Sequence, residues 1–187
     1  IFRDAATWIA NRYSLVRICI YGAGAIGGYL GAQLALAGGQ VSLIARGPHL
    51  VAMKEHGVRL LSNGKEQLAR ARCSEDPSVL GPQDYVIVTL KAHSVPGIID
   101  AMQPLLGPDT TVVTAVNGIP WWYFYGLEGL YRDRRLESVD PGGKQWAGIG
   151  NEVFNVAFPV HKGLVTTEKS LYRKLGCAKQ EGICIKD

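Results

Sequence analysis

The feature that most constrains the fold is an uncharged stretch of 28 residues, 18–45. A run of this length is long enough to span a bilayer. Gly27 and Gly31 also form the GxxxG spacing of packed membrane helices. However, polar residues and the pair Gly38-Gly39 interrupt the run, so that no apolar segment of about 20 residues remains. We therefore expect that the stretch does not cross a membrane.

The uncharged stretch is predicted to form a strand, a helix and a second strand. Residues 17–21, RICIY, are apolar and rich in β-branched side chains, as is typical of a strand. Apolar residues at helical spacing predict a helix over about 25–37, and QVSLIA at 40–45 predicts the second strand. A unit of about 30 residues in this order is a βαβ crossover.

The turn between the first strand and the helix carries the GxGxxG pattern, as GAGAIG. In this context Gly22 permits the tight turn, Gly24 lets the backbone approach a pyrophosphate, and Gly27 lets the helix pack closely on the sheet. Free N–H groups at the helix start would hold the phosphates. The residues predicted to bind the cofactor here are Gly22, Ala23, Gly24, Ala25, Ile26 and Gly27.

Arg46 follows the second strand, 24 positions after Gly22. An NAD site usually has an acidic residue at this place, where it binds the ribose 2′-hydroxyl, whereas an arginine suits the 2′-phosphate of NADP. The nearest following acid is Glu55, nine positions further on. We therefore predict NADP, the alternative being an arginine in a solvent-exposed turn.

Two further buried strands are predicted at 84–90, DYVIVTL, and at 110–116, TTVVTAV. Strands that alternate with helices predict an α/β fold, a Rossmann-like, doubly wound parallel sheet with helices on both faces. In such sheets ligands bind at the carboxyl ends of the strands. Lys91 and Asn117 directly follow these two strands, so both are predicted to line the cofactor site. A solvated lysine and a plain Asn-Gly turn are the alternatives.

The remaining segments are less regular. An Asn-Gly pair at 63–64 predicts a hairpin within 57–73. Ser94 is expected to cap a helix that has Pro96 in its first turn and that ends at about Leu106.

Composition and spacing argue against several other functions. The net charge of +4 comes without a dense basic block, so no nucleic-acid partner is expected. The four cysteines form no CxxC, the four histidines form no HxxxH, and no metal site is predicted. No GxSxG hydrolase elbow occurs. His93 lies near Lys91 and could donate a proton, but no orienting partner is apparent. This cysteine pattern is most consistent with reduced thiols in a cytoplasmic protein.

Four segments together resemble the amino-terminal, NADP-binding domain of the ketopantoate reductase (2-dehydropantoate 2-reductase) family, over about residues 17–160. They are ICIYGAGAIGGYLGAQLALAG, VSLIARG, DYVIVTLKAH and AVNGIPWW. The resemblance implies NADPH-dependent reduction of 2-dehydropantoate to pantoate in pantothenate biosynthesis. It also implies 2′-phosphate binding by Arg46, and a cleft lined by Lys91 and Asn117, with Asn117 also binding the substrate.

The resemblance ends before the helical second domain of the family, which supplies the lysine that acts as general acid. No catalytic residue is therefore assigned, and nothing distinguishes among Lys162, Lys169 and Lys174. The expected organisation is a leader at 1–16, the Rossmann domain at 17–150, and a divergent tail at 151–187. The last 25 or so residues of that tail do not resemble the family, and the alternatives for it are a truncated start of the second domain, a frame-shifted end or a different splice.

Two other functions stay open. Besides the reduction of 2-dehydropantoate, the alternatives are a truncated NADP(H)-binding module without turnover and a related reductase that acts on another 2-keto acid. The expected partner is a small 2-keto acid, with no membrane and no nucleic acid, and a homodimer is a further open alternative.

Overall fold

The computed structural model of the chain describes residues 16–62, 64–124, 128–149, 154–157 and 165–166. Its strands are β1 (Arg17–Tyr21), β2 (Gln40–Ile44), β3 (Val58–Ser62), β4 (Lys65–Ala69), β5 (Arg72–Ser74), β6 (Tyr85–Val88), β7 (Thr111–Thr114), β8 (Phe154–Ala157) and β9 (Val165–Thr166). Its α-helices are α2 (Ala25–Leu36), α3 (Gly47–His56), α4 (Ile99–Met102) and α5 (Lys144–Ile149). Five 3₁₀ turns complete the described elements: η1 (Pro77–Val79), η2 (Ala92–Ser94), η3 (Pro96–Ile98), η4 (Gln103–Leu105) and η5 (Pro141–Gly143).

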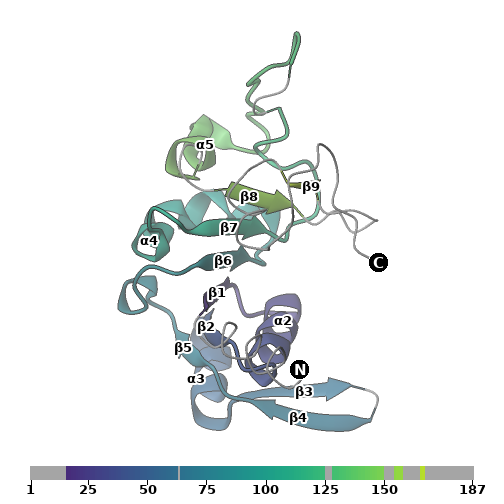
Figure 1. Cartoon of the computed structure of the whole chain (residues 1–187), viewed down its shortest axis with the longest axis vertical. Coiled ribbons are helices and arrows are strands. Elements are labelled where there is room, and N and C mark those ends of the chain that lie inside the picture. Colours follow the sequence, from purple (N-terminus) through teal and green to yellow (C-terminus); the bar gives the residue numbers. More distant parts are fainter. Residues whose placement is uncertain (1–15, 63, 125–127, 150–153, 158–164, 167–187) are drawn as a thin grey trace, which may run out of the picture.

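The main sheet confirms the predicted Rossmann-like architecture. Its strand order among the described residues is β5-β2-β1-β6-β7-β8-β9, in which every neighbouring pair is parallel except β8 with β9 (Figure 1). This is the doubly wound order, with the topological switch between β1 and β6. In the register, Tyr21 pairs with both Ile44 and Val88, and Val88 pairs with Thr114. The carboxyl ends of the four central strands therefore form one common edge.

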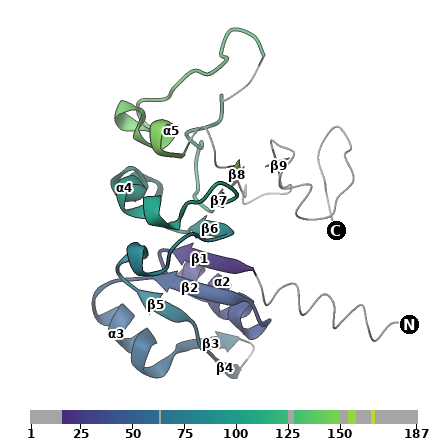
Figure 2. The ribbon, with the colours of Figure 1, turned by 60° about the vertical axis from the view of Figure 1, so that its left-hand side comes forward.

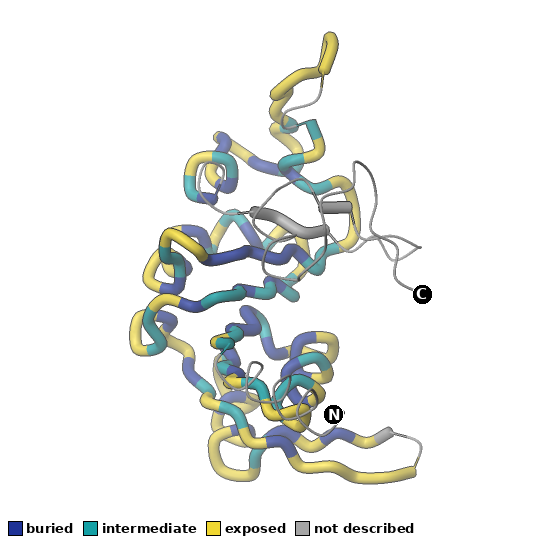
Figure 3. The backbone as a smooth tube through the Cα atoms, viewed as in Figure 1, coloured by how far each residue is buried: buried dark blue, intermediate teal, exposed yellow. Residues whose placement is uncertain are grey.

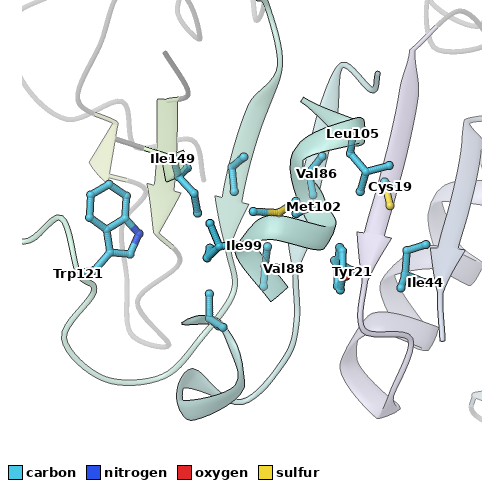
Figure 4. Packing of buried hydrophobic residues seen from close by; sticks show 12 residues of the cluster. Cys19, Tyr21, Ile44, Val86, Val88, Ile99, Met102, Leu105, Trp121 and Ile149 are labelled. Atoms are coloured by element: carbon cyan, nitrogen blue, oxygen red, sulfur yellow. The ribbon is translucent and has the colours of Figure 1, made fainter. Parts of the chain in front are cut away.

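Alternate residues of β1 point to opposite faces of the sheet, as the pleat requires. Cys19 and Tyr21 join the core cluster covered by α4 and α5, in which Ile99, Met102 and Ile149 lie against the strands (Figure 4). Figure 3 shows the same central strands as the most buried part of the tube. Ile20 joins a second cluster on the opposite face, which is formed with α2, α3 and the hairpin β3–β4 (Figure 2).

The GxxxG pair of α2 is explained by packing of the helix on the sheet. Gly31 is buried, and a Cβ atom there would overlap with Cδ2 of Leu43 on β2. A Cβ atom on Gly27 would lie 3.0 Å from Cγ2 of Ile20 on β1. The small residues thus bring helix and strands together within one domain. Within the described ranges, none of the helices has both the length and the hydropathy that a membrane span requires.

The predicted regular helix from Ser94 to about Leu106 is wrong. The segment consists of η2, η3, η4 and the four-residue α4. Pro96 occupies the first turn of η3 and Pro104 that of η4, and a proline has no N–H to continue a helix. The expected Ser94 cap is also wrong, because Val95 caps η3 and makes no side-chain hydrogen bond there.

The segment between β2 and β6 contains elements that the sequence pattern did not indicate. The predicted hairpin is confirmed as β3 and β4, which pair in antiparallel register and form a separate sheet. Asn63 of its turn lies outside the described residues. Helix α3 was not predicted, and neither was β5, which pairs in parallel with β2 and carries Cys73 into the main sheet. Beyond position 150, β8 pairs in parallel with β7.

Burial of Cys19 gives the fold a pH dependence that can be measured. The thiol is fully buried, and burial raises its pKa from 9.0 to about 12. The unfolded chain therefore ionises at a lower pH than the folded chain, and stability is complete below pH 9 and lost as the pH rises towards 12. The Cys19 contribution to the free energy of unfolding should fall by about 1.4 kcal/mol per pH unit in this window.

Urea unfolding of the wild type and of Cys19→Ala under reducing conditions, at pH 8, 9 and 10, would measure this contribution. The difference in the free energy of unfolding between the two proteins should shrink as the pH rises. Only the wild type has a Cys19 thiol that ionises in the unfolded chain while it stays neutral in the fold. A constant difference would show that Cys19 remains ionisable in the fold.

Candidate dinucleotide-binding site

The turn between β1 and α2 is fixed by hydrogen bonds to its own backbone and to β2. The N–H groups of Gly22 and Ala23 both donate to the carbonyl oxygen of Ile44, at 3.1 and 3.0 Å. The N–H group of Gly24 donates to the carbonyl oxygen of Gly22 at 2.8 Å. The turn therefore has a defined shape before any ligand binds.

The first three N–H groups of α2 are available to a ligand. In the part of the chain that the structure describes, the backbone bonds at this end begin with Gly28, which donates to Gly24 at 2.7 Å, and Ala25, Ile26 and Gly27 have no backbone acceptor. Gly24 provides no side-chain cap, and the first turn contains no acidic residue. Uncapped donors and the positive end of the helix dipole make this turn suitable for an anion such as a phosphate.

Each motif glycine has its own structural reason. Gly22 has φ +105°, and a Cβ atom there would lie 2.6 Å from Cδ2 of Leu90. A Cβ atom on Gly27 would overlap with the carbonyl oxygen of Gly22 and with Oγ1 of Thr89. A Cβ atom on Gly24 would have no neighbour within 4 Å in the described part of the chain. Packing within the fold therefore requires glycine at positions 22 and 27, whereas Gly24 leaves a space beside the N-terminus of α2.

Thr89 contributes to the turn and was not predicted from the sequence. Its hydroxyl donates to the carbonyl oxygen of Gly22 at 2.6 Å, and its N–H group donates to that of Tyr21 at 3.0 Å. It follows β6 directly, at the position where side chains reach the edge of the sheet. Its place near the end of the predicted strand 84–90 was the only available signal, because its partners are 67 and 68 residues away.

The structure places Arg46, Lys91 and Asn117 at the same edge of the sheet as the turn. Arg46 lies two residues beyond the end of β2, Lys91 lies three beyond the end of β6, and Asn117 lies three beyond the end of β7. All three side chains are exposed. Among the described residues none of them forms an ion pair or a side-chain hydrogen bond. The edge that carries the N-terminus of α2 therefore also carries two cations and one amide.

Arg46 is also the N-terminal cap of α3, with φ −142° and ψ 164°. A cation at the N-terminus of a helix is disfavoured by the helix dipole. The first turn of α3 contains no acidic side chain to compensate. An anion between the guanidinium and this helix end would be stabilised by both.

His49 is the other site residue that the sequence did not reveal. Its Nε2 atom lies 2.7 Å from the carbonyl oxygen of Ala23. A pocket of about 530 Å³ lies beside this contact, between the start of α2, His49 and β3. By contrast, His93 is exposed on η2, and Lys162, Lys169 and Lys174 lie outside the described residues.

Comparison with known proteins agrees with this geometry. The family described as ketopantoate reductase PanE/ApbA matches residues 18–120, more than half of the chain. A 2-dehydropantoate 2-reductase from Mesorhizobium japonicum is 48% identical over 147 residues, which cover 77% of this chain and 45% of that protein. The chain thus spans less than half the length of this relative.

Solved structures resemble the chain in the same region. A candidate ketopantoate reductase from Ralstonia solanacearum MolK2 has a TM-score of 0.71 at 42% identity, covering 79% of this chain and 46% of that one. A D-mandelate dehydrogenase, solved with NADH and anilino(oxo)acetate, has a TM-score of 0.55 at 27% identity, covering 75% of this chain and 40% of that one. From its sequence match and its fold, the chain belongs to the ketopantoate reductase PanE/ApbA family.

Proposed function

We propose that this chain forms the NADPH-binding part of a 2-dehydropantoate 2-reductase. The observation that carries the proposal is the row of N–H groups at the start of α2 that find no acceptor among the described residues, at the topological switch point of the sheet. The residues present fit a dinucleotide, because Gly24 leaves open space beside these donors and Arg46 provides a cation at the end of β2. Gly22, Ala23, Gly24, Ala25, Ile26 and Gly27 would hold the pyrophosphate.

The other residues at the edge would orient the two reactants. Arg46 would bind the 2′-phosphate, and Lys91 would bind a further anionic group of the cofactor or substrate. The Asn117 amide would bind both the nicotinamide and the carbonyl or carboxylate of a small 2-keto acid. NADPH, when bound, supplies the hydride that reduces the substrate carbonyl.

The proton for the developing alkoxide is proposed to come from a lysine outside the matched region. The match covers only 45% of the Mesorhizobium japonicum protein, so more than half of that relative lies outside it. A cytoplasmic role in pantothenate synthesis is part of the proposal. It is supported by the free thiols of Cys19 and Cys73, which a reducing compartment would keep in that state.

A second candidate is a reductase that acts on another 2-keto acid. The likeness to a D-mandelate dehydrogenase bound to anilino(oxo)acetate favours it, because that ligand is a bulky 2-oxo acid derivative. Turnover of the full chain with 2-dehydropantoate and with phenylglyoxylate, monitored by NADPH absorbance, separates the two. NADPH binding without oxidation by either substrate would leave a binding module without turnover, and no NADPH binding would contradict the site itself.

Gly24 provides a test of the cofactor site that leaves the fold intact. Gly24 is the N-cap of α2 with φ −74°, and a Cβ atom there would meet none of the described residues. Gly24→Ala should therefore change stability by no more than about 1 kcal/mol in either direction, because alanine restricts the unfolded chain but is a poorer N-cap than glycine. The same methyl group would occupy the space where the backbone approaches a pyrophosphate, so NADPH affinity should fall by about tenfold or more. Thermal unfolding and NADPH fluorescence titration measure the two effects. Unchanged affinity would place the pyrophosphate elsewhere.

A further inference from the structure

The peptide group between Ala23 and Gly24 is held at both of its polar ends. Its N–H group, on Gly24, donates to the carbonyl oxygen of Gly22 at 2.8 Å. Its carbonyl oxygen, on Ala23, lies 2.7 Å from Nε2 of His49. This peptide immediately precedes the free N–H groups of α2, so its orientation sets the direction in which that row of donors begins.

The composition of the turn explains why such a restraint matters. The Ala23–Gly24 peptide turns about ψ of Ala23 and φ of Gly24, and a glycine leaves the Gly24 side little restricted. Among the described residues, nothing lies within 4 Å of a Cβ position on Gly24. Steric restraint on that side is therefore weak, and the two hydrogen bonds add the restraint that it lacks.

His49 brings this restraint from a different part of the chain. It lies in the first turn of α3, three residues after Arg46 and 26 residues from Ala23. Because a carbonyl oxygen only accepts, Nε2 must carry the hydrogen, and both the neutral Nε2–H tautomer and the protonated ring can donate it. The imidazole thereby links the turn that would bind the pyrophosphate to the turn that would bind the 2′-phosphate.

We propose that His49 is a positioning residue for the dinucleotide. It fixes the Ala23–Gly24 peptide so that the first N–H groups of α2 are preorganised for the pyrophosphate. This inference rests on the proposed NADPH site. A preorganised site loses less conformational freedom when the dinucleotide binds. The His49 hydrogen bond should therefore raise the affinity for NADPH as well as the stability of the fold.

The test uses the full chain in four forms: wild type, His49→Leu, His49→Gln and His56→Leu. Leucine removes the donor, whereas the glutamine amide nitrogen can occupy the place of Nε2 and donate. His56 is the matched control, because it lies in the last turn of the same helix, exposed beside Glu55. NADPH affinity should fall about three- to tenfold in His49→Leu, the range expected for one neutral hydrogen bond. It should return in His49→Gln and stay unchanged in His56→Leu.

A measurement without cofactor completes the test. Amide hydrogen exchange of Gly24 should be faster in His49→Leu, and restored in His49→Gln, while the exchange of Ile20 and Val86 in the core strands stays unchanged. Wild-type affinity in His49→Leu, or no recovery in His49→Gln, would overturn the positioning role. Failure of the wild type to bind NADPH would instead contradict the proposed function.

Discussion

The Gly27→Ala variant should lose both stability and cofactor binding, whereas Gly28→Ala, one position later, should be harmless. The added methyl group at Gly27 would overlap with the Gly22 carbonyl oxygen and with the Thr89 hydroxyl. The backbone oxygen cannot move without displacing the turn. We expect the free energy of unfolding to fall by about 1–3 kcal/mol, as for other overpacked cores, and NADPH affinity to fall by more than tenfold.

Gly28 provides the control for helix propensity. A Cβ atom there has its nearest neighbour at 3.8 Å, the carbonyl oxygen of Ala23, which is an ordinary contact. Alanine is favoured over glycine in a helix by up to about 1 kcal/mol, so Gly28→Ala should be as stable as the wild type or more stable. Urea unfolding and NADPH titration compare the two variants. Equal behaviour of the two variants would contradict the close packing of α2 against the turn.

The Arg46→Ala variant should lose its preference for NADPH over NADH. A charge-assisted contact to the 2′-phosphate contributes about 1.5–3 kcal/mol, so NADPH affinity should fall roughly 10- to 100-fold. NADH affinity should change little, because NADH has no phosphate at that position. Titration of both cofactors at two salt concentrations gives the ratio of the NADPH affinity to the NADH affinity, and the part of that ratio that is electrostatic.

Arg70→Ala serves as the control for Arg46. Arg70 is exposed, and it follows β4 in the separate hairpin sheet rather than a strand of the central edge. Its removal lowers the net charge by the same amount, and NADPH affinity should remain within about twofold. If Arg46→Ala weakens NADPH and NADH equally, Arg46 does not bind the 2′-phosphate. Lys91 would then be the next residue to substitute.

The parts of the fold that the sequence predicted correctly depend on local signals. Strand β1, helix α2 and strand β2 follow from apolar periodicity and from the glycines that separate them. The hairpin was recognised from one Asn-Gly pair. The doubly wound parallel architecture then followed from the alternation of strands and helices, because such sheets are built in few ways.

The parts that were missed depend on distant contacts or on weak local patterns. Helix α3 begins with Gly47 and Pro48, which read as a turn, although its buried Leu50 and Met53 hold it to the rest of the domain. Strand β5 is three residues long and is defined only by its pairing with β2. The predicted helix after Ser94 failed because two prolines outweighed a plausible cap.

At the candidate site, the sequence indicated the residues that belong to a motif or follow a strand. It did not indicate the residues that hold the turn between β1 and α2 in its shape. The glycines, Arg46, Lys91 and Asn117 were named from spacing and from their places after strands, and their roles stay predictions. Thr89 and His49 contact the turn from 67 and 26 residues away. Neither residue type is distinctive at its position, so only the folded arrangement shows that both bind the backbone of the turn.

The hydrogen bond from Thr89 to Gly22 has a consequence for the order of folding. The segment that holds the glycine motif can form its strand, helix and strand early, from contacts close in sequence. Its turn gains the Thr89 restraint only when β6 has docked beside β1, across a separation of 67 residues. A growing chain on the ribosome would thus carry the motif long before it could hold a nucleotide, and cofactor affinity would arise as a late step in the maturation of the domain.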